Sequence, residues 1–240
     1  MIQPPAPHPD PDVSAGPHEL RPGLWWRQVG VADVPALQEI CLRTGDAGRD
    51  ATARTAFPEL LADVYATPYA HHEARFGTVV EDADGVAGYL LGCRDTAAFE
   101  RWREAEWWPP LRARYPRPED VQGFDAGPLR TVHGGVTPEP VWATHPSHLH
   151  VDLLPRLQGK GIGRALVQRV CAQLAADGSP GVHLGVSGAN PGAVAFYRRA
   201  GLVELAATAR GYTFGRSFGS VGPSAAGSTA TGSTATAPAS

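Results

Sequence analysis

Lysine is almost absent from this chain of 240 residues, since Lys160 is the only one and arginine carries the remaining basic charge. The formal net charge is only -3 and the pI is near 6.3, so the sequence lacks the basic field that attracts nucleic acids or anionic membranes. No apolar run approaches the roughly 20 residues that span a bilayer. We therefore expect neither a nucleic-acid nor a membrane partner.

Cysteine is also scarce, with three residues far apart at Cys41, Cys93 and Cys171. Their number is odd, and no CxxC pair offers zinc-ligand spacing or a disulfide framework. The first residues, Met1 to Pro17, lack the basic and apolar regions of a secretion signal. These absences favour a reducing, cytoplasmic location, and the composition rich in arginine, alanine, glycine and proline favours a bacterial source.

Both ends of the chain have compositions typical of disorder. Residues 1–22 hold seven prolines and few apolar side chains, and residues 217–240 consist mostly of serine, threonine, alanine and glycine. The chain as a whole is 42% hydrophobic and 19% charged, which suits one globular core. We predict a disordered arm over 1–22, one α/β domain over 23–216 and a disordered tail over 217–240.

Hydrophobic periodicity assigns most elements of this domain. A strand over 24–29 and helices over 34–41 and 58–65 precede an antiparallel hairpin over 77–93, whose turn holds an Asp-Gly pair. Helical spacing over 96–114 is interrupted by Pro109 and Pro110, which should end or kink the helix. A connection rich in proline and glycine runs to about 140. Strands at 148–154 and 182–186 alternate with helices at 161–176 and 191–199, and two short strands over 202–205 and 212–214 end the domain.

Three glycines, Gly159, Gly161 and Gly163, lie between a predicted strand and a predicted helix. Glycine permits close approach of the backbone to a ligand, and the first amides of a helix lack internal partners and lie at its positive end. The segment therefore predicts a site for an anion, phosphate in particular.

Two nucleotide motifs do not match this loop. A dinucleotide fingerprint would need glycine at Arg164 or at Leu166, and a phosphate-binding loop of nucleotide triphosphatases would need serine or threonine after the lysine, where Gly161 stands. The pattern that does match is Q-x-x-G-x-G, from Gln158 to Gly163.

This pattern resembles the loop of the GNAT superfamily of N-acetyltransferases that holds the coenzyme A pyrophosphate. Asn190 and the segment AFYRRAGL at 195–202 resemble the second conserved region of that superfamily. The stretches HPSHLHVDLLPRLQGKGIGRALV and EAEWWPPLRARYP are more closely similar to the acetyltransferase-like domain at the C-terminus of O-GlcNAcases and to its free-standing bacterial relatives. The resemblance covers about 24–214 and implies one mixed, mostly antiparallel, twisted sheet of about six to seven strands flanked by helices.

The resemblance also implies acetyl-CoA as co-substrate and assigns residues to it. Leu153 and Leu154 would lie along the pantetheine, and Asn190 would bind it or cap the following helix. The pyrophosphate would contact Gln158, Gly159, Gly161, Gly163 and Arg164, with added charge from Lys160.

Strand alternation places His148, His150 and Asp152 on one face, opposite an apolar face that should meet the core. Asp152 is the first candidate for the general base that takes a proton from an attacking amine, with His148 and His150 as alternatives. By resemblance, Tyr197 would protonate the leaving thiolate. The histidines lack acidic or cysteine partners at recognised metal-ligand spacing, so we expect no metal.

Two functions fit these features. One is transfer of an acetyl group from acetyl-CoA to a primary amine, on a small molecule or a peptide lysine. The other is a non-catalytic module that binds acetyl-CoA or a protein partner, in which Asp152 only orders a loop and Tyr197 only packs. The sequence leaves both the acceptor and the oligomeric state open.

Overall fold

A computed structural model describes residues 17–209 and 211–219, and its centre is one sheet of eight strands in the order β1-β2-β3-β4-β5-β6-β8-β7. The strands are β1 (His18–Arg21), β2 (Leu24–Gln28), β3 (Thr78–Asp82), β4 (Gly85–Cys93), β5 (Ser147–Leu153), β6 (Gly181–Ser187), β7 (Val203–Thr208) and β8 (Gly211–Ser217). The prediction of six or seven strands was low by at least one. The additional strand is β1, which lies inside the segment expected to be disordered and pairs with β2. The rest of that arm, residues 1–16, and the tail from residue 220 lie outside the described residues.

All neighbouring strands pair antiparallel except β5 and β6, which pair in parallel. The predicted hairpin over 77–93 is confirmed as β3 and β4, and its turn places Asp82 opposite Gly85. Gly85 has φ of 98°, a conformation that a residue with a Cβ rarely adopts, which explains the glycine there.

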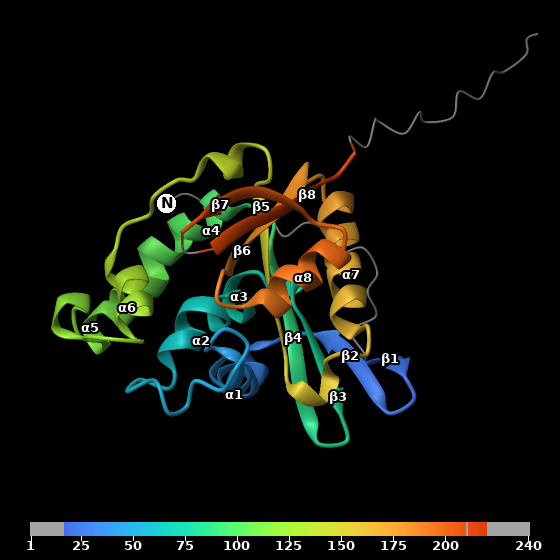
Figure 1. Cartoon of the computed structure of the whole chain (residues 1–240), viewed down its shortest axis with the longest axis horizontal. Helices are drawn as coiled ribbons and strands as arrows, with labels where there is room; N and C mark the ends of the chain where they lie inside the picture. The colour runs from blue at the N-terminus through green and yellow to red at the C-terminus, as the bar shows by residue number, and fades with distance from the viewer. Residues whose placement is uncertain (1–16, 210, 220–240) are drawn as a thin grey trace, which may run out of the picture.

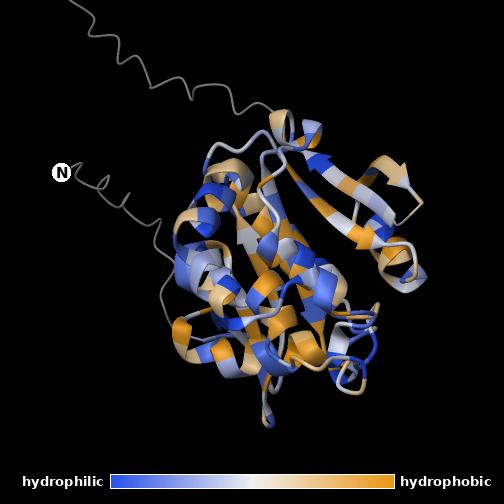
Figure 2. Ribbon diagram, turned by 90° about the vertical axis from the view of Figure 1, so that its left-hand side faces the viewer, coloured by the Kyte–Doolittle hydropathy of each residue, from blue (hydrophilic) through white to orange (hydrophobic). Residues whose placement is uncertain are grey.

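Helices cover both faces of the sheet (Figure 1). The helical elements are α1 (Val34–Thr44), α2 (Leu60–Tyr65), α3 (Thr67–His72), α4 (Thr96–Trp102), a π-helix (Arg103–Trp107), α5 (Trp108–Arg114), α6 (Ala126–His133), α7 (Ile162–Ala176) and α8 (Pro191–Arg199). Helix α7 packs on β4, β5 and β6, whereas α1 and α3 pack against β4 from the other side. Hydrophobic residues gather on the central strands and on the inward sides of these helices (Figure 2).

The segment between β4 and β5 forms a lobe beside the sheet (Figure 1). Its two prolines do not break the helical path. They occupy the first turn of α5, where no helical amide is needed, and the π-helix precedes them. Helix α6 was not predicted, because its stretch appeared as a connection rich in proline and glycine. Leu129 and Val132 of α6 pack with Leu60 and Trp108 in a second hydrophobic core.

Strands β5 and β6 separate soon after they pair. Only Ser147 with Val182 and His148 with His183 are paired, although β5 continues to Leu153 and β6 to Ser187. Beyond His148, every second peptide group of β5 points toward the gap, because alternate groups of a strand face opposite edges. We call this divergence the fork, and it gives β5 an unpaired edge in the middle of the sheet.

Candidate active site

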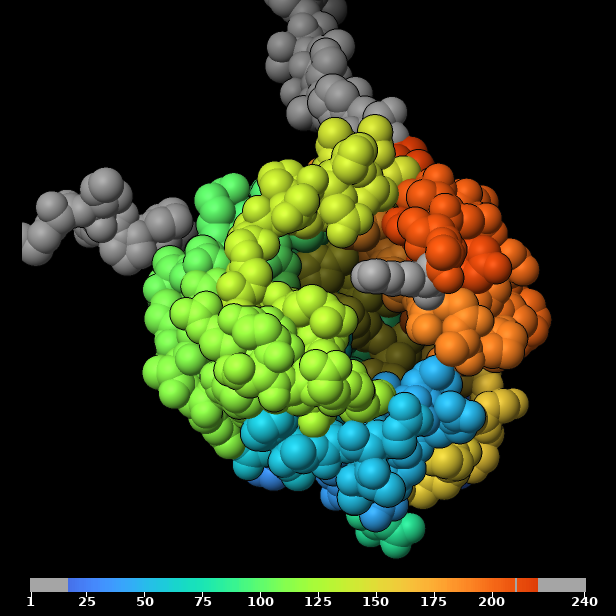
Figure 3. All heavy atoms as spheres, turned by 60° about the vertical axis from the view of Figure 1, so that its left-hand side comes forward, coloured from blue at the N-terminus to red at the C-terminus, as the bar shows by residue number. Residues whose placement is uncertain are grey.

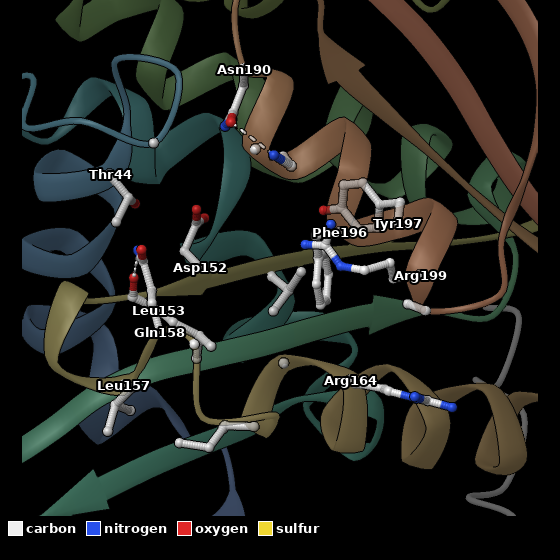
Figure 4. Close-up of a pocket in the computed structure, with 18 of the residues that line it drawn as sticks. Thr44, Asp152, Leu153, Leu157, Gln158, Arg164, Asn190, Phe196, Tyr197 and Arg199 are labelled. Carbon is white, nitrogen blue, oxygen red and sulfur yellow. Dashed lines mark hydrogen bonds between the residues drawn. The ribbon is translucent and has the colours of Figure 1, made fainter.

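A cleft of about 560 Å³ lies beside the fork. It is bounded by the end of α1, the outer half of β5, the glycine loop, the start of α7 and helix α8. Its lining residues are Thr44, Ala47, Gly48, Val151, Asp152, Leu153, Leu157, Gln158, Gly159, Gly161, Ile162, Gly163, Arg164, Asn190, Gly192, Ala193, Phe196, Tyr197, Arg199 and Ala200. Nine of the eleven site residues expected from the sequence are therefore brought together (Figure 4).

The glycine loop has the geometry that an anion site requires. Gly159 and Gly161 have φ of 71° and 77°, so the left-handed conformation explains glycine at both positions. Gly161 is the N-cap of α7, whose first amides have no acceptor inside the helix. At Gly163 an added Cβ would lie 3.1 Å from the Phe196 ring, so this glycine lets α7 and α8 approach each other.

Gln158 lines the cleft and also forms a hydrogen bond within the protein. Its Nε2 atom donates to the carbonyl oxygen of Leu153 at 2.8 Å, so the amide fastens the glycine loop to the end of β5 (Figure 4). The two remaining predicted residues do not line the cleft. Leu154 is 6% exposed and packs in the main core, because a 3-10 turn follows it and rotates the chain. Lys160 is exposed on the outside of the loop.

Asp152 lies on the cleft wall with its carboxylate directed into the cleft (Figure 4). One carboxylate oxygen accepts a hydrogen bond from the Tyr89 hydroxyl at 2.7 Å. Burial raises the pKa of Asp152 from 3.8 to about 6, against the opposing effect of hydrogen bonds from Tyr89 and Thr44. A carboxylate with this pKa is mostly ionised at neutral pH and is a stronger base than an exposed one.

Tyr197 reaches the cleft from α8, and its hydroxyl points into it (Figure 4). The side chain is 7% exposed and its ring also packs against Phe196 and Phe214. Burial raises the pKa of Tyr197 above its ordinary range, and the negative charge of Asp152 raises it further. The hydroxyl therefore keeps its proton at neutral pH and can act as a hydrogen-bond donor.

Asn190 caps α8, because its Oδ1 atom accepts from the Ala193 amide at 3.0 Å. The predicted cap is thus confirmed. The other amide atom of Asn190 faces the backbone of Gly48, where an added Cβ would lie 3.1 Å from Nδ2. The loop after α1 and the start of α8 consequently meet at this end of the cleft.

The face of β5 that carries the histidines is buried at the His148 end, although the sequence predicted only the opposite, apolar face to meet the core. Tyr69 and Phe99 cover His148, which is 7% exposed. The Thr96 hydroxyl donates to Pro146 at 2.6 Å and therefore accepts from His148 Nδ1 at 2.8 Å. His148 Nε2 then accepts from the Tyr69 hydroxyl at 2.5 Å.

The surroundings of the two histidines differ from those of Asp152 in their effect on the pKa. Burial lowers the pKa of His148 well below its usual value, and both ring nitrogens are already engaged. Burial lowers the pKa of His150 to about 4, with a contribution from the charge of Arg103. Both imidazoles are neutral at pH 7 and are weaker bases than Asp152.

The model of the acetyltransferase (GNAT) family matches residues 50–202 of this chain. The chain belongs to this GNAT family. A solved structure described as SsHAT is 36% identical, with a TM-score of 0.75, over 82% of this chain and 98% of that one. A second, described as an acetyltransferase, is 20% identical with a TM-score of 0.50 over 80% and 98% of the two chains, which supports the fold alone.

Among curated proteins, the O-GlcNAcase of Rattus norvegicus is 25% identical over 178 residues, 72% of this chain and 19% of the relative. The O-GlcNAcase of Mus musculus is 26% identical over 153 residues, 62% of this chain and 17% of the relative. The chain thus spans about a fifth of the length of these curated relatives.

Several cleft residues of this GNAT domain carry no sequence signal. Thr44 and Gly48 reach the cleft only because α1 ends beside β5, and Tyr89 meets Asp152 through the register of β4 and β5. Within residues 17–209 and 211–219, no helix has both the length and the apolar character needed to cross a membrane. In the same residues, no group of three or more histidine, cysteine or acidic side chains is placed to hold a metal ion.

Proposed function

We propose that this domain transfers the acetyl group of acetyl-CoA to a primary amine, with Asp152 as general base and Tyr197 as hydrogen-bond donor to the leaving sulfur. The observation that carries the proposal is that a single cleft beside the fork holds the glycine loop, the ionised Asp152 and the protonated Tyr197. Membership of the GNAT family supports the same reaction class.

The cleft is suited to each part of the cofactor. Free amides of the glycine loop and of the start of α7 would receive the pyrophosphate, with Arg164 at the rim. The pantetheine contains two amide groups, and the unpaired edge of β5 would bond them as a neighbouring strand does. Leu153 and Val151 would contact its apolar parts. The thioester then lies between Asp152 and Tyr197.

The proposed chemistry moves one proton at each end of the reaction. The amine nitrogen attacks the thioester carbonyl carbon, and Asp152 takes the proton that the nitrogen loses, directly or through one water. The bond between carbon and sulfur breaks, and Tyr197 donates to the departing thiolate. Protonation of Asp152 removes the negative charge that raises the pKa of Tyr197, so the hydroxyl becomes a better donor as the sulfur leaves. The products are the N-acetylated amine and free coenzyme A.

The test measures thiol release from acetyl-CoA in the presence of a panel of primary amines, together with the affinity for coenzyme A by calorimetry. Asp152→Asn should lower kcat by a factor of roughly 100 or more, whereas Tyr197→Phe should lower it about tenfold with little change in KM. Both variants should keep their affinity for coenzyme A, since neither residue belongs to the glycine loop.

The pH profile gives a second test. In the unmodified protein kcat/KM should rise through a pH near 6, where Asp152 ionises. Tight binding of coenzyme A without thiol release for any amine would instead establish the non-catalytic module. Absence of binding would contradict acetyl transfer and a module that binds acetyl-CoA, and would favour a module that binds a protein partner.

A further inference from the structure

A second cavity, of about 170 Å³, adjoins the inner half of the fork. We call it the side cavity. Its walls come from β5, β6, α2, α3 and the lobe, and include Tyr65, Arg103, Glu139, Trp142, His150 and His183. His150 lines the side cavity and Asp152 lines the cleft. These two residues lie on the same face of β5, roughly 7 Å apart along the strand.

Because His150 and Asp152 are neighbours on one face of β5, the two cavities follow one another along that strand. Figure 3 shows a hollow of the molecular surface over this part of the chain. The rim of this hollow is formed by the segment between α1 and α2, by the lobe and by α8, with the chain around β5 at its floor. An elongated molecule in the side cavity therefore points one end toward Asp152. This is the direction from which an acceptor must approach if acetyl-CoA fills the cleft.

The cation on the wall of the side cavity, Arg103, already has a carboxylate partner. The Arg103 guanidinium is 8% exposed, forms an ion pair with Glu100 and donates to the Val64 carbonyl at 3.1 Å. His150 and His183 are held neutral, because burial lowers the pKa of both. Neither ring therefore brings a positive charge to the cavity at neutral pH.

Glu139 is a charged residue on the wall of the side cavity whose side chain has no such partner among the described residues. Within the described part of the chain its carboxylate takes part in no ion pair or side-chain hydrogen bond, and it stands at the start of the turn that carries Trp142. The Tyr65 ring, 37% exposed, lies on another wall of the same cavity, at 6.0 Å from the His150 ring. A cavity lined by one carboxylate and two aromatic rings is a favourable environment for an organic cation.

Resting on the proposed function, we infer that the acceptor is a short aliphatic diamine or polyamine, whose second ammonium group is bound by Glu139, Trp142 and Tyr65 in the side cavity. The reacting amine then extends along β5 to Asp152. A volume of about 170 Å³ suits an alkyl chain with one ammonium group, whereas the several rings of an aminoglycoside exceed it.

The experiment compares three amines of equal chain length, 1,5-diaminopentane, pentylamine and 5-aminopentanoate, by thiol release from acetyl-CoA. The intact protein should prefer the diamine over pentylamine in kcat/KM by about three- to tenfold, the range expected of one partly exposed charge pair with a cation–π contact. The aminopentanoate should be the poorest, because its carboxylate faces Glu139. In Glu139→Gln the ratio of diamine to pentylamine should fall to within about twofold.

The matched control is Glu119→Gln, which removes an exposed carboxylate of the same lobe that lines neither cavity and should keep the ratio. Equal turnover of the three amines, or an unchanged ratio in Glu139→Gln, would overturn the inference while acetyl transfer itself stands. Calorimetry of 1,5-diaminopentane with the protein bound to coenzyme A tests recognition without turnover. Binding should weaken severalfold in Glu139→Gln, and equal binding to both proteins would also overturn the inference.

Discussion

Replacement of Asp152 by asparagine should stabilise the protein at neutral pH although it lowers kcat. The carboxylate is nearly isosteric with the amide, and the amide oxygen can still accept the hydrogen bond from Tyr89. What the substitution removes is a negative charge that the fold holds in a poorly solvated place. Residues at reacting centres often carry such a cost in stability.

The magnitude follows from the pKa. Each pKa unit corresponds to about 1.4 kcal/mol, so a rise from 3.8 to about 6 means that ionised Asp152 costs the folded state about 3 kcal/mol. The neutral carboxyl group is the reference for this figure, so the weaker hydrogen bond that a neutral acceptor forms with Tyr89 is already included in it. We expect Asp152→Asn to raise the free energy of unfolding at pH 8 by about 3 kcal/mol.

The sign determines the pH dependence. A carboxyl group whose pKa is raised by folding favours the folded state below its unfolded pKa, and this contribution is lost as the pH rises through the folded value. The advantage of the variant should therefore be near zero at pH 4, grow up to about pH 6 and stay constant above it.

Urea unfolding of both proteins without coenzyme A, at pH values from 4 to 8, measures this difference, because all other titrating groups cancel between them. Asp120→Asn, which changes an exposed carboxylate, is the control and should shift stability little at any pH. A variant less stable than the parent at pH 8, or a difference that does not change with pH, would refute the reasoning.

Three further substitutions separate stability from binding. Gly161→Ala should cost about 1 kcal/mol of stability, because φ is 77°, and should weaken the affinity for coenzyme A severalfold in calorimetry. The control is Gly23→Ala, at φ of 76°, which should cost as much stability and leave the affinity unchanged. His148→Ala should lower the free energy of unfolding by about 2 to 4 kcal/mol, since it leaves a cavity and deprives the Tyr69 hydroxyl of its acceptor, but the pH at which kcat/KM rises should not move. Asn190→Ala should lose about 1 kcal/mol with the helix cap, and Asn190→Ser should restore it in thermal unfolding.

Local patterns in the sequence predicted the elements that carry the site. The alternation of β5, the glycine loop and the helices α7 and α8 all depend on short-range spacing and on residues with special backbone conformations, which are visible in the letters. The turn between β3 and β4 was predictable for the same reason, because Gly85 supplies the positive φ that the turn needs.

Features that depend on tertiary contacts were missed. Helix α6 has Gly127 and Pro128 in its first turn, which made its stretch resemble a connection, and it is stabilised by burial of Leu129 and Val132 in the second hydrophobic core. Strand β1 has only four residues and exists through its pairing with β2. The resemblance assigned Leu154 to the cofactor, and the letters alone could not show that β5 ends at Leu153 and that Leu154 packs in the main core.

The fork also bears on how the sheet behaves as a mechanical unit. Only two residue pairs join β5 to β6, so the sheet divides into two parts, one of strands β1 to β5 and one of strands β6 to β8. Helix α7 packs on strands of both parts. A ligand whose amides bond to the free edge of β5 would act as an additional strand between these two parts of the sheet. On addition of coenzyme A, hydrogen exchange should then slow markedly at those amides of residues 149–153 that face the gap, and should change little at the alternate amides that face β4. The cofactor would then be a removable part of the architecture.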